Sequence, residues 1–337
     1  MRAFLVTEPG VGSVQDVTAP TAARGEVVVD VALAGICGTD SSLFHGDAER
    51  MRSTRNTYPL RLGHEWCGTI SEVGDRVDST WLGRRVTGDT MIGCGHCERC
   101  LDGRHYLCYD RVEIGVRGNW PGALAERLLV PVVALHPLPD SVNDIMGAMV
   151  EPGGNSWRSV AAAEAGPGRR ILVIGPGTIG LLCAAFARAA GSEVHVLGRN
   201  PTALALAIDL GVDGAWTDST LPGLRWDAVI DATDAPTMPQ RAVELVEAGR
   251  RVVYVGISVD PSLVDSRLIA RKDVTAVGIL GASLGIDPTI EAYASGSVDP
   301  TRLVATTIGL DQVAAALHGW KPDDRPGFPK ILVDPRL

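Results

Sequence analysis

The 337-residue chain contains no run of apolar residues long enough to span a membrane, and residues 1–9 lack the apolar stretch of a secretory signal. We therefore expect a cytoplasmic protein with no membrane partner. The chain also lacks excess positive charge: 31 Lys and Arg stand against 40 Asp and Glu, and the formal net charge is -9. A nucleic-acid partner would require a basic surface, so this class of partner is not expected. Lysine is nearly absent, and we find no internal repeat and no low-complexity segment.

Length and composition predict a globular protein of two domains. A chain of 337 residues exceeds the size of one ordinary hydrophobic core, and its 45% hydrophobic and 21% charged residues have the balance of a soluble protein. In the first 150 residues, short apolar runs such as 26–33 are separated by turns that contain glycine. This pattern is typical of a compact, mostly β region.

From residue 170 onward the pattern changes to alternating strands and helices. Strands are expected at 171–174, 194–197, 228–231 and 251–255, and helices at 179–190, 203–210 and 240–247. Such alternation predicts an α/β fold with a doubly wound parallel sheet that helices cover on both faces. The tail at 329–335 contains one further strand, which we expect to return to the first domain.

A glycine-rich turn follows the first of these strands. The segment Gly175-Pro-Gly177-Thr178-Ile179-Gly180 fits the pattern G-x-G-x-x-G. The pattern is more specific here because it follows an expected apolar strand and lies at the start of an expected helix. The first glycine makes the turn, the second lets the backbone approach a pyrophosphate at the helix N-terminus, and the third lets the helix pack on the sheet. We predict a dinucleotide cofactor; the alternative is a helix-packing turn that binds no ligand.

The end of the second strand indicates which dinucleotide is preferred. NAD-binding chains of this kind place a carboxylate about 20 residues after the glycines to bind the ribose 2′-hydroxyl. Here the strand ends in Gly198, Arg199 and Asn200, so no carboxylate is present to repel a 2′-phosphate. Gly198 is expected to leave room and Arg199 to offer a planar set of donors. This predicts NADP(H) in preference to NAD(H); the alternative is a solvated arginine at a strand end.

Four cysteines within residues 91–110 predict a structural metal. Their spacing is C-x2-C-x2-C-x7-C. Four thiolates saturate a tetrahedral zinc ion and leave no position for water or substrate, so this zinc would stabilise a loop. An iron–sulfur cluster is the rival, but the fourth cysteine is too distant for a ferredoxin pattern and no proline follows it. The proposed ligands are Cys94, Cys97, Cys100 and Cys108.

Chemistry at a metal requires a second, open site. Candidate ligands occur in Cys37-Gly-Thr39-Asp40, in His64-Glu65 and at Glu151. Three ligands drawn from a thiolate, an imidazole and carboxylates would leave one position of a zinc ion for a substrate oxygen. Composition alone cannot join residues so far apart in sequence, and individually Cys37 and His64 would more often be core residues.

Taken in order, these motifs resemble the zinc-dependent medium-chain alcohol dehydrogenases, in the branch that acts on polyols, sugars and cyclitols. The resemblance covers essentially the whole chain. It implies a GroES-like, β-rich catalytic domain at 1–153 with a structural zinc lobe, and a Rossmann NADP-binding domain at 154–297. Residues 298–337 would then return to the catalytic domain.

The resemblance also implies roles for single residues. Cys37, His64 and Glu151 match the catalytic zinc ligands, and Glu65 matches a carboxylate that either binds the metal or lies just behind it. Thr39 matches the hydroxyl that passes on the substrate proton, and Asp40 matches a partner of the ligands. The histidine that ends the proton relay in some members would fall at Ser42, so His45 is the candidate for that role or for lining the pocket.

The resemblance implies hydride transfer between NADP(H) and a secondary alcohol or ketone, with two zinc ions per chain. A glutamate at position 151 points to a polyol, sugar or (amino)cyclitol substrate, and Glu113 and Trp120 lie where family members approach it. A homodimer or homotetramer is expected. Two alternatives remain: a zinc-independent quinone or enoyl reductase of the same fold, and a non-catalytic NADPH-binding protein.

Overall fold

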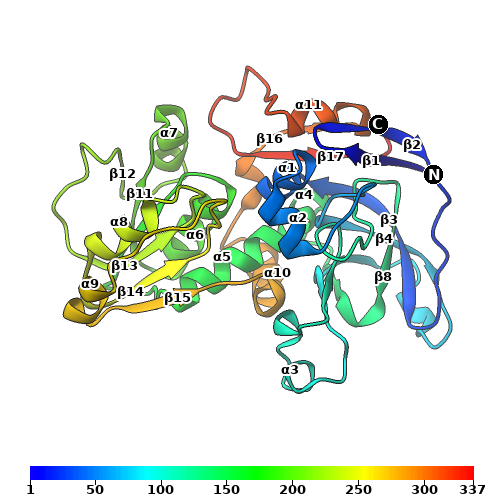
Figure 1. Cartoon of the computed structure of the whole chain (residues 1–337), viewed down its shortest axis with the longest axis horizontal. Helices are drawn as coiled ribbons and strands as arrows, with labels where there is room; N and C mark the ends of the chain where they lie inside the picture. The colour runs from blue at the N-terminus through cyan, green and yellow to red at the C-terminus, as the bar shows by residue number, and fades with distance from the viewer. The chain divides into compact units, whose positions relative to one another are not determined.

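The computed structural model describes every residue of the chain, 1–337, and the chain forms two compact units (Figure 1). The N-terminal unit comprises Met1–Glu151, Val304–Pro322 and Lys330–Leu337. The second unit comprises Pro152–Leu303 and Asp323–Pro329. No helix is long and apolar enough to cross a membrane.

The N-terminal unit is built on a seven-stranded sheet in the order β16-β17-β3-β4-β5-β9, with β8 also paired to β3. Its strands are β3 (Glu26–Gly35), β4 (Glu65–Val73), β5 (Arg85–Gly88), β8 (Arg127–Pro131), β9 (Leu135–Pro137), β16 (Val304–Ile308) and β17 (Lys330–Val333). Two smaller pairs are β1 (Arg2–Glu8) with β2 (Val11–Asp16), and β6 (Met91–Ile92) with β7 (Val112–Glu113). The helices are α1 (Gly38–Phe44), α2 (Ala48–Thr54), α3 (Glu98–Leu101), α4 (Asp144–Ala148) and α11 (Val313–Leu317).

The core of this unit explains why the sheet forms. Strand β3 alternates outward Asp30 with buried valines such as Val29 and Val31, and these pack with Phe4, Phe44 and other apolar side chains. Strand β17 contributes Ile331 and Val333 to the same core, although almost 300 residues separate it from β3. The C-terminal strand therefore belongs to the N-terminal unit.

The second unit contains a six-stranded parallel sheet in the order β12-β11-β10-β13-β14-β15. The strands are β10 (Arg170–Ile174), β11 (Glu193–Leu197), β12 (Gly214–Trp216), β13 (Trp226–Asp231), β14 (Val246–Tyr254) and β15 (Thr275–Gly278). The helices are α5 (Val150–Ala162, which begins in the N-terminal unit), α6 (Thr178–Ala189), α7 (Pro201–Asp209), α8 (Met238–Leu245), α9 (Ser266–Lys272) and α10 (Ile286–Ala294). The strand order reverses between β10 and β13, as in a Rossmann fold.

Some boundaries differ from those expected from sequence. The helix expected at 240–247 ends at Leu245, because Val246 already pairs with Trp226 in the sheet. Residues 298–303 belong to the second unit, where the short helix Pro300–Leu303 contacts α6, and not to the C-terminal return. Residues 323–329 also belong there, since Gly327 lies against Thr202.

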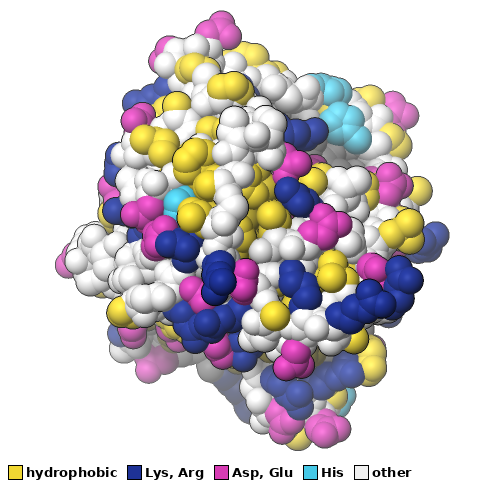
Figure 2. All heavy atoms as spheres, turned by 90° about the vertical axis from the view of Figure 1, so that its left-hand side faces the viewer, with side chains coloured by type: hydrophobic (Ala, Val, Ile, Leu, Met, Phe, Trp, Pro, Cys, Tyr) yellow, Lys and Arg dark blue, Asp and Glu magenta, His cyan; other side chains and the backbone are white.

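Acidic and basic side chains are interspersed on the face that Figure 2 shows. The formal net charge of -9 is thus not concentrated in one acidic area on this face.

Candidate active site and metal centres

Three candidate ligands meet in the N-terminal unit where β3 and β4 pair. The ligand atoms of Cys37, His64 and Glu65 all lie within 4.8 Å of one another. The sheet register causes this meeting: Gly35 pairs with Glu65, so the loop after β3 and the residue before β4 are brought side by side. His64 and Glu65 are buried, and Cys37 is half-buried at the start of α1.

Asp40 organises this cluster from the first turn of α1. Its carboxylate accepts hydrogen bonds from the backbone N–H groups of Cys37 (2.9 Å) and Gly63 (3.1 Å), and its Oδ1 lies 3.3 Å from Nδ1 of His64. Burial lowers the pKa of His64, but the nearby Asp40 and Cys37 outweigh it, so this pKa is raised well above its ordinary value. A carboxylate beside Nδ1 favours the tautomer protonated there, which leaves Nε2 with a lone pair for a metal.

Lys330 is the counter-charge of Glu65. Its Nζ donates to Oε2 of Glu65 (2.5 Å) and to the carbonyl oxygen of Ile36 (2.9 Å), and both charged side chains are about 1–2% exposed. Burial lowers the pKa of Lys330, but Glu65 and then Cys37 outweigh it, so the net shift is upward. Gly35 makes the space, since a Cβ there would lie only 2.0 Å from Oε2 of Glu65. Sequence reasoning missed Lys330, and its only signal was a lysine in a chain nearly devoid of them.

The donor set fits a zinc ion. A thiol, an imidazole and a carboxylate within 4.8 Å of one another, all on ordered elements, are the ligand types that zinc prefers. Glu151 lies in the first turn of α5 and is also buried, but its carboxylate is not among the three clustered ligands. The structure therefore groups Glu65 with Cys37 and His64, and the role of Glu151 as a ligand stays a prediction.

The other residues of the predicted relay lie on or just after α1. Thr39 is half-buried in the first turn of this helix. His45 is exposed at the helix end, where its Nδ1 lies 2.9 Å from the carbonyl oxygen of Ser41. Its ring contacts those of Phe44 and His318 at centroid distances of 5.0 and 5.4 Å. The recorded partners of His45 therefore come from its own helix and from His318.

The four lobe cysteines form a second cluster, and their spacing fits tetrahedral zinc. Sulfur–sulfur distances are 4.0 Å for Cys94–Cys100, 3.6 Å for Cys97–Cys100 and 3.8 Å for Cys97–Cys108. Zinc–sulfur bonds of about 2.3 Å give a tetrahedron with edges of about 3.8 Å. The backbone N–H groups of His96 and Cys97 lower the pKa of the Cys94 thiol to about 6, which favours the thiolate that binds metal.

The lobe is tied to the sheet by one ion pair. Nε2 of His105 lies 2.7 Å from Oδ2 of Asp89, while Oδ1 of Asp89 accepts from the N–H of Met91. His96 is exposed and contacts only the carbonyl oxygen of Cys94 among its recorded polar partners. The two remaining thiols, Cys67 and Cys183, are buried, and burial raises the pKa of each to about 12, so they are inert core residues.

In the second unit, the glycine turn has the geometry that a pyrophosphate site requires. Gly175 has φ +100, a conformation that favours glycine, and a Cβ on Gly180 would lie 1.8 Å from the carbonyl oxygen of Gly175. A Cβ on Gly177 would meet nothing within 4 Å, so the backbone at the start of α6 is open to a ligand. Thr178 and Ile179 form the first turn of this helix. These features fit a dinucleotide phosphate group.

At the end of β11 the structure adds to one expectation. A Cβ on Gly198 would lie 2.7 Å from the ring of Pro176, so packing against Pro176 gives a second reason for glycine here beside the predicted room for a 2′-phosphate. Asn200 is the N-cap of α7, where its Oδ1 accepts from the N–H of Thr202 (2.9 Å). Arg199 is exposed and makes no recorded side-chain bond.

Two residues beside the glycine turn were not predicted. Asp231 ends β13 and is buried; its Oδ1 accepts from the hydroxyl (2.7 Å) and the N–H (3.0 Å) of Thr233. Burial raises the pKa of this carboxyl group. A Cβ on Gly175 would touch Thr233, so the pair flanks the turn at the carboxyl edge of the sheet. The only feature of the sequence that could have indicated this pair is a carboxylate at the end of an expected strand.

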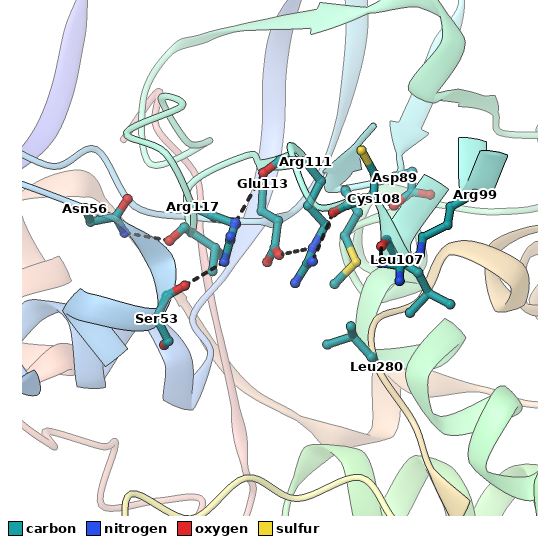
Figure 3. Close-up of polar contacts among 12 residues, drawn as sticks. Ser53, Asn56, Asp89, Arg99, Leu107, Cys108, Arg111, Glu113, Arg117 and Leu280 are labelled. Atoms are coloured by element: carbon teal, nitrogen blue, oxygen red, sulfur yellow. Dashed lines mark hydrogen bonds and ion pairs between the residues drawn. The ribbon is translucent and has the colours of Figure 1, made fainter. Parts of the chain in front are cut away.

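The two predicted substrate residues have different surroundings. Glu113 is nearly buried, and its Oε1 accepts from Nε of Arg111 at 2.8 Å (Figure 3). Trp120 packs against the core of the N-terminal unit, and its Nε1 donates to the carbonyl oxygen of Leu129 (3.4 Å). Glu113 is therefore half of an ion pair and not a free carboxylate.

Comparisons with known proteins agree with this architecture. Residues 23–140 match a family model described as the alcohol dehydrogenase GroES-like domain, and residues 178–295 match one described as zinc-binding dehydrogenase. The L-threonine 3-dehydrogenase of Coxiella burnetii is 30% identical over 273 residues, 78% of each chain.

Two solved structures are similar over 99% of both chains, each with a TM-score of 0.90. One, 29% identical, is an alcohol dehydrogenase (rspB) from Escherichia coli CFT073 complexed with NADH. The other, 28% identical, is a zinc-binding dehydrogenase of putative function from Sinorhizobium meliloti 1021 bound to NADP. The chain belongs to the zinc-dependent medium-chain alcohol dehydrogenase family, and it has that family's GroES-like and Rossmann folds. It is accordingly an oxidoreductase.

Proposed function

We propose that the protein is a zinc-dependent dehydrogenase that transfers a hydride between NADP(H) and a secondary alcohol or its ketone. The observation that carries this proposal is the cluster of Cys37, His64 and Glu65, whose ligand atoms lie within 4.8 Å of one another. The four-cysteine lobe has four thiol ligands, which would seal a structural metal from solvent and substrate. The mixed, three-ligand set leaves a coordination position for a substrate oxygen.

The chain's own residues would have separate tasks in this reaction. A zinc ion at this cluster supplies a Lewis acid that lowers the pKa of a bound hydroxyl group. Cys37, His64 and either Glu65 or Glu151 would hold it, Asp40 fixes the imidazole of His64, and Lys330 offsets the charge of Glu65. Thr39 would accept the hydroxyl proton and pass it toward solvent, while the carbon-bound hydrogen leaves as hydride to the nicotinamide.

The cofactor preference rests on Arg199. Related proteins are bound to NADH in one structure and to NADP in another, so family membership leaves this choice open. The exposed guanidinium at the end of β11 supports NADP(H), because nothing else is recorded to pair with it. Arg199→Ala should weaken NADPH binding by about 1.5–3 kcal/mol and change NADH binding little. Equal losses for the two cofactors in a fluorescence titration would contradict the assignment.

We infer a polyol, sugar or cyclitol as the substrate class. The Nη2 groups of Arg111 and Arg117, which the protein does not pair, would stay unpaired around a small apolar alcohol, which disfavours ethanol and other primary alcohols. The test is an oxidation screen of polyols, sugar derivatives, cyclitols and simple alcohols with NADP, together with zinc content per chain. Two zinc ions and turnover of a secondary alcohol support the proposal. One zinc ion without alcohol oxidation favours a quinone or enoyl reductase, or a non-catalytic NADPH-binding protein.

We also propose a homo-oligomer, a dimer or tetramer. Strand β15 lies at one edge of the parallel sheet, and Thr275, Ala276 and Gly278 are exposed. Uncovered edges of this kind are normally paired or blocked in soluble proteins. Light scattering coupled to size exclusion should give a mass of at least two chains, and a single-chain mass would contradict the proposal.

A further inference from the structure

Three arginines and one glutamate come from two adjacent segments of the N-terminal unit. Glu113 and Arg111 lie two residues apart, point the same way from the chain and form an ion pair (Figure 3). Arg117, across a tight turn, donates from Nε to the carbonyl oxygen of Arg111 (3.2 Å) and from Nη1 to that of Ser53 (2.6 Å). Arg55 follows α2, and the residues on either side of it bond to the same turn: the N–H of Gly118 donates to the carbonyl oxygen of Thr54, and Nδ2 of Asn56 donates to that of Val116. We call Arg55, Arg111 and Arg117 the arginine group.

The charge of this group is not balanced by the protein. Glu113 is the one carboxylate that pairs with it. Asp110 precedes Arg111 but is exposed and has no recorded contact with the three. The pKa of Arg117 is lowered first by burial and then by Arg111 and Arg55, and only Glu113 opposes this shift. Three guanidinium groups against one carboxylate leave an excess of positive charge; Arg111 and Arg117 are half-buried, and Arg55 is exposed.

The arginines also keep unused hydrogen-bond donors. A guanidinium group has five N–H bonds. Arg111 uses Nε for Glu113 and Nη1 for the carbonyl oxygen of Cys108, and Arg117 uses Nε and Nη1 for backbone carbonyl groups. The Nη2 groups of both, and the whole side chain of Arg55, have no recorded partner. The bonds already made hold the guanidinium planes of Arg111 and Arg117 in place, so the Nη2 donors of these two residues are pre-oriented.

The turn that carries the group runs beside the proposed zinc ligands. Gly115, at the tip of the turn, has φ +69, and a Cβ there would lie 2.4 Å from the carbonyl oxygen of Gly63. Gly63 immediately precedes His64. Two residues of chain span at most about 7 Å, so the α-carbon of Glu113 lies at most on the order of 15 Å from that of His64. An arginine side chain and a substrate of five or six carbon atoms together can bridge this distance.

From these contacts we propose that the arginine group binds an oxyanion of the substrate, so that the secondary alcohol to be oxidised also carries a carboxylate or a phosphate group. The proposal rests on the dehydrogenase function proposed above and narrows its substrate class to sugar acids or sugar phosphates. Planar guanidinium groups match the paired oxygens of both anions. An amine-bearing cyclitol is disfavoured, because Arg111 already pairs with Glu113 and the remaining charge repels a cation.

The first experiment compares substrates that differ only in charge. We would measure kcat/KM with NADP for neutral polyols, the corresponding sugar acids and the corresponding sugar phosphates at constant ionic strength. One of the two anionic sets should exceed its neutral counterpart by about tenfold to a hundredfold, the value of one or two charge-assisted hydrogen bonds. The carboxylate and phosphate arms identify which anion is used. Equal or better use of the neutral or amine-bearing compounds overturns the proposal.

Variants then test the arginines themselves. Arg55→Gln is the most direct, because this exposed side chain makes no bond that folding needs, and Arg111→Gln removes the better-positioned donor. Each should lower the ratio of kcat/KM for anionic over neutral substrate by about tenfold, and Arg111→Lys should restore only part of it. Arg104→Gln is the matched control, since Arg104 is an exposed lobe arginine that pairs with Asp102. A ratio that changes no more in Arg55→Gln and Arg111→Gln than in this control contradicts the proposal.

A binding measurement separates this proposal from the proposed reaction. Inorganic phosphate and acetate would be titrated into the zinc-loaded protein by calorimetry, with chloride keeping ionic strength constant. Saturable binding of either ion that weakens about tenfold in Arg111→Gln, but not in Arg104→Gln, supports the anion site even if no alcohol in the screen is oxidised. Absence of saturable binding by both ions, with turnover of neutral alcohols intact, rejects the anion site and leaves the dehydrogenase function standing.

Discussion

The two ligand clusters of the N-terminal unit are assembled by different means. The four cysteines of the lobe come from one loop of fifteen residues, Cys94–Cys108, whose regular elements are a four-residue helix and a 3-10 turn. Cys37, His64 and Glu65, which we call the mixed cluster, come from two separate segments that the pairing of β3 with β4 brings together. The lobe has little besides its metal to hold it, whereas the mixed cluster is positioned by a folded sheet. We therefore propose that a metal at the first site serves structure, and that the second site has ligands in place for chemistry.

The largest effect should come from Cys37→Ser. The sheet, Asp40 and Lys330 keep the other ligands in place, so the protein should stay folded and still bind NADPH. Its turnover should fall on the order of 10³-fold, because loss of the metal removes several kcal/mol of stabilisation of the reacting oxygen. The measurements are kcat, melting temperature, zinc per chain and NADPH affinity. Cys183→Ala, which removes a buried thiol outside both clusters, is the control.

Cys100→Ser should give the opposite profile. Zinc binding by four thiolates is coupled to the folding of the lobe, so this change should remove one zinc ion and lower the free energy of unfolding by roughly 4 kcal/mol or more. Turnover per folded molecule should fall far less than in Cys37→Ser. A well-folded Cys100→Ser that loses turnover, beside an active Cys37→Ser, would show that the two sites have been assigned in reverse.

Lys330→Met tests whether the mixed cluster is held by its counter-charge. Removal of one partner of a buried ion pair leaves the other charge uncompensated and costs about 3–5 kcal/mol. Thermal and chemical denaturation should show this loss in Lys330→Met and a partial recovery in the double variant with Glu65→Gln. If the double variant is no more stable than Lys330→Met, the cost comes from packing and not from the unpaired carboxylate.

The smallest effect should come from Glu193→Gln in the second unit, where no group of metal ligands lies. This variant tests how stability depends on pH away from the two clusters. Hydrogen bonds from Arg170 and then His195 lower the pKa of Glu193 to about 2. Its stabilising effect is present above the unfolded pKa of about 4.3 and is lost as pH falls from there toward about 2. Since the side chain is 40% exposed, Glu193→Gln should cost only about 1 kcal/mol. The difference from wild type in denaturant midpoints should be constant above pH 5 and shrink below it; a difference that grows on acidification contradicts the assignment.

Much of the fold was predictable because its signals are local. The lobe spacing, the glycine turn and the alternation of strands and helices each depend on residues close in sequence, and the structure contains the Cys94–Cys108 cluster and the parallel sheet that they predict. The mixed cluster could not be derived from spacing, because the register of β3 and β4 creates it. It was found only through the resemblance to a family.

The features that the sequence did not predict are contacts between particular side chains. Lys330 is 265 residues from Glu65, and no local pattern connects them. The packing of Gly198 against the ring of Pro176, 22 residues earlier, is likewise not visible in the sequence, and the predicted room for a phosphate there stays a prediction. Glu113 was predicted to lie near the substrate, but its ion pair with Arg111, two residues away, was not predicted, because only the side-chain directions reveal it. In each case the neighbour in space, and not the residue itself, decides the role.

The position of Lys330 on the C-terminal strand has a consequence for the order of synthesis. Strand β17 lies between β16 and β3 in the large sheet. The N-terminal unit can therefore be completed only after the strands of the second unit have been synthesised. Every strand of the second unit is made before β17 exists, and domains generally fold as they are synthesised. Until the final eight residues are added, Glu65 has no counter-charge and β3 lacks a neighbour. A chain that ends before β17 would therefore contain a complete Rossmann unit and an incomplete metal site. We expect such a chain to bind the cofactor without catalysing hydride transfer.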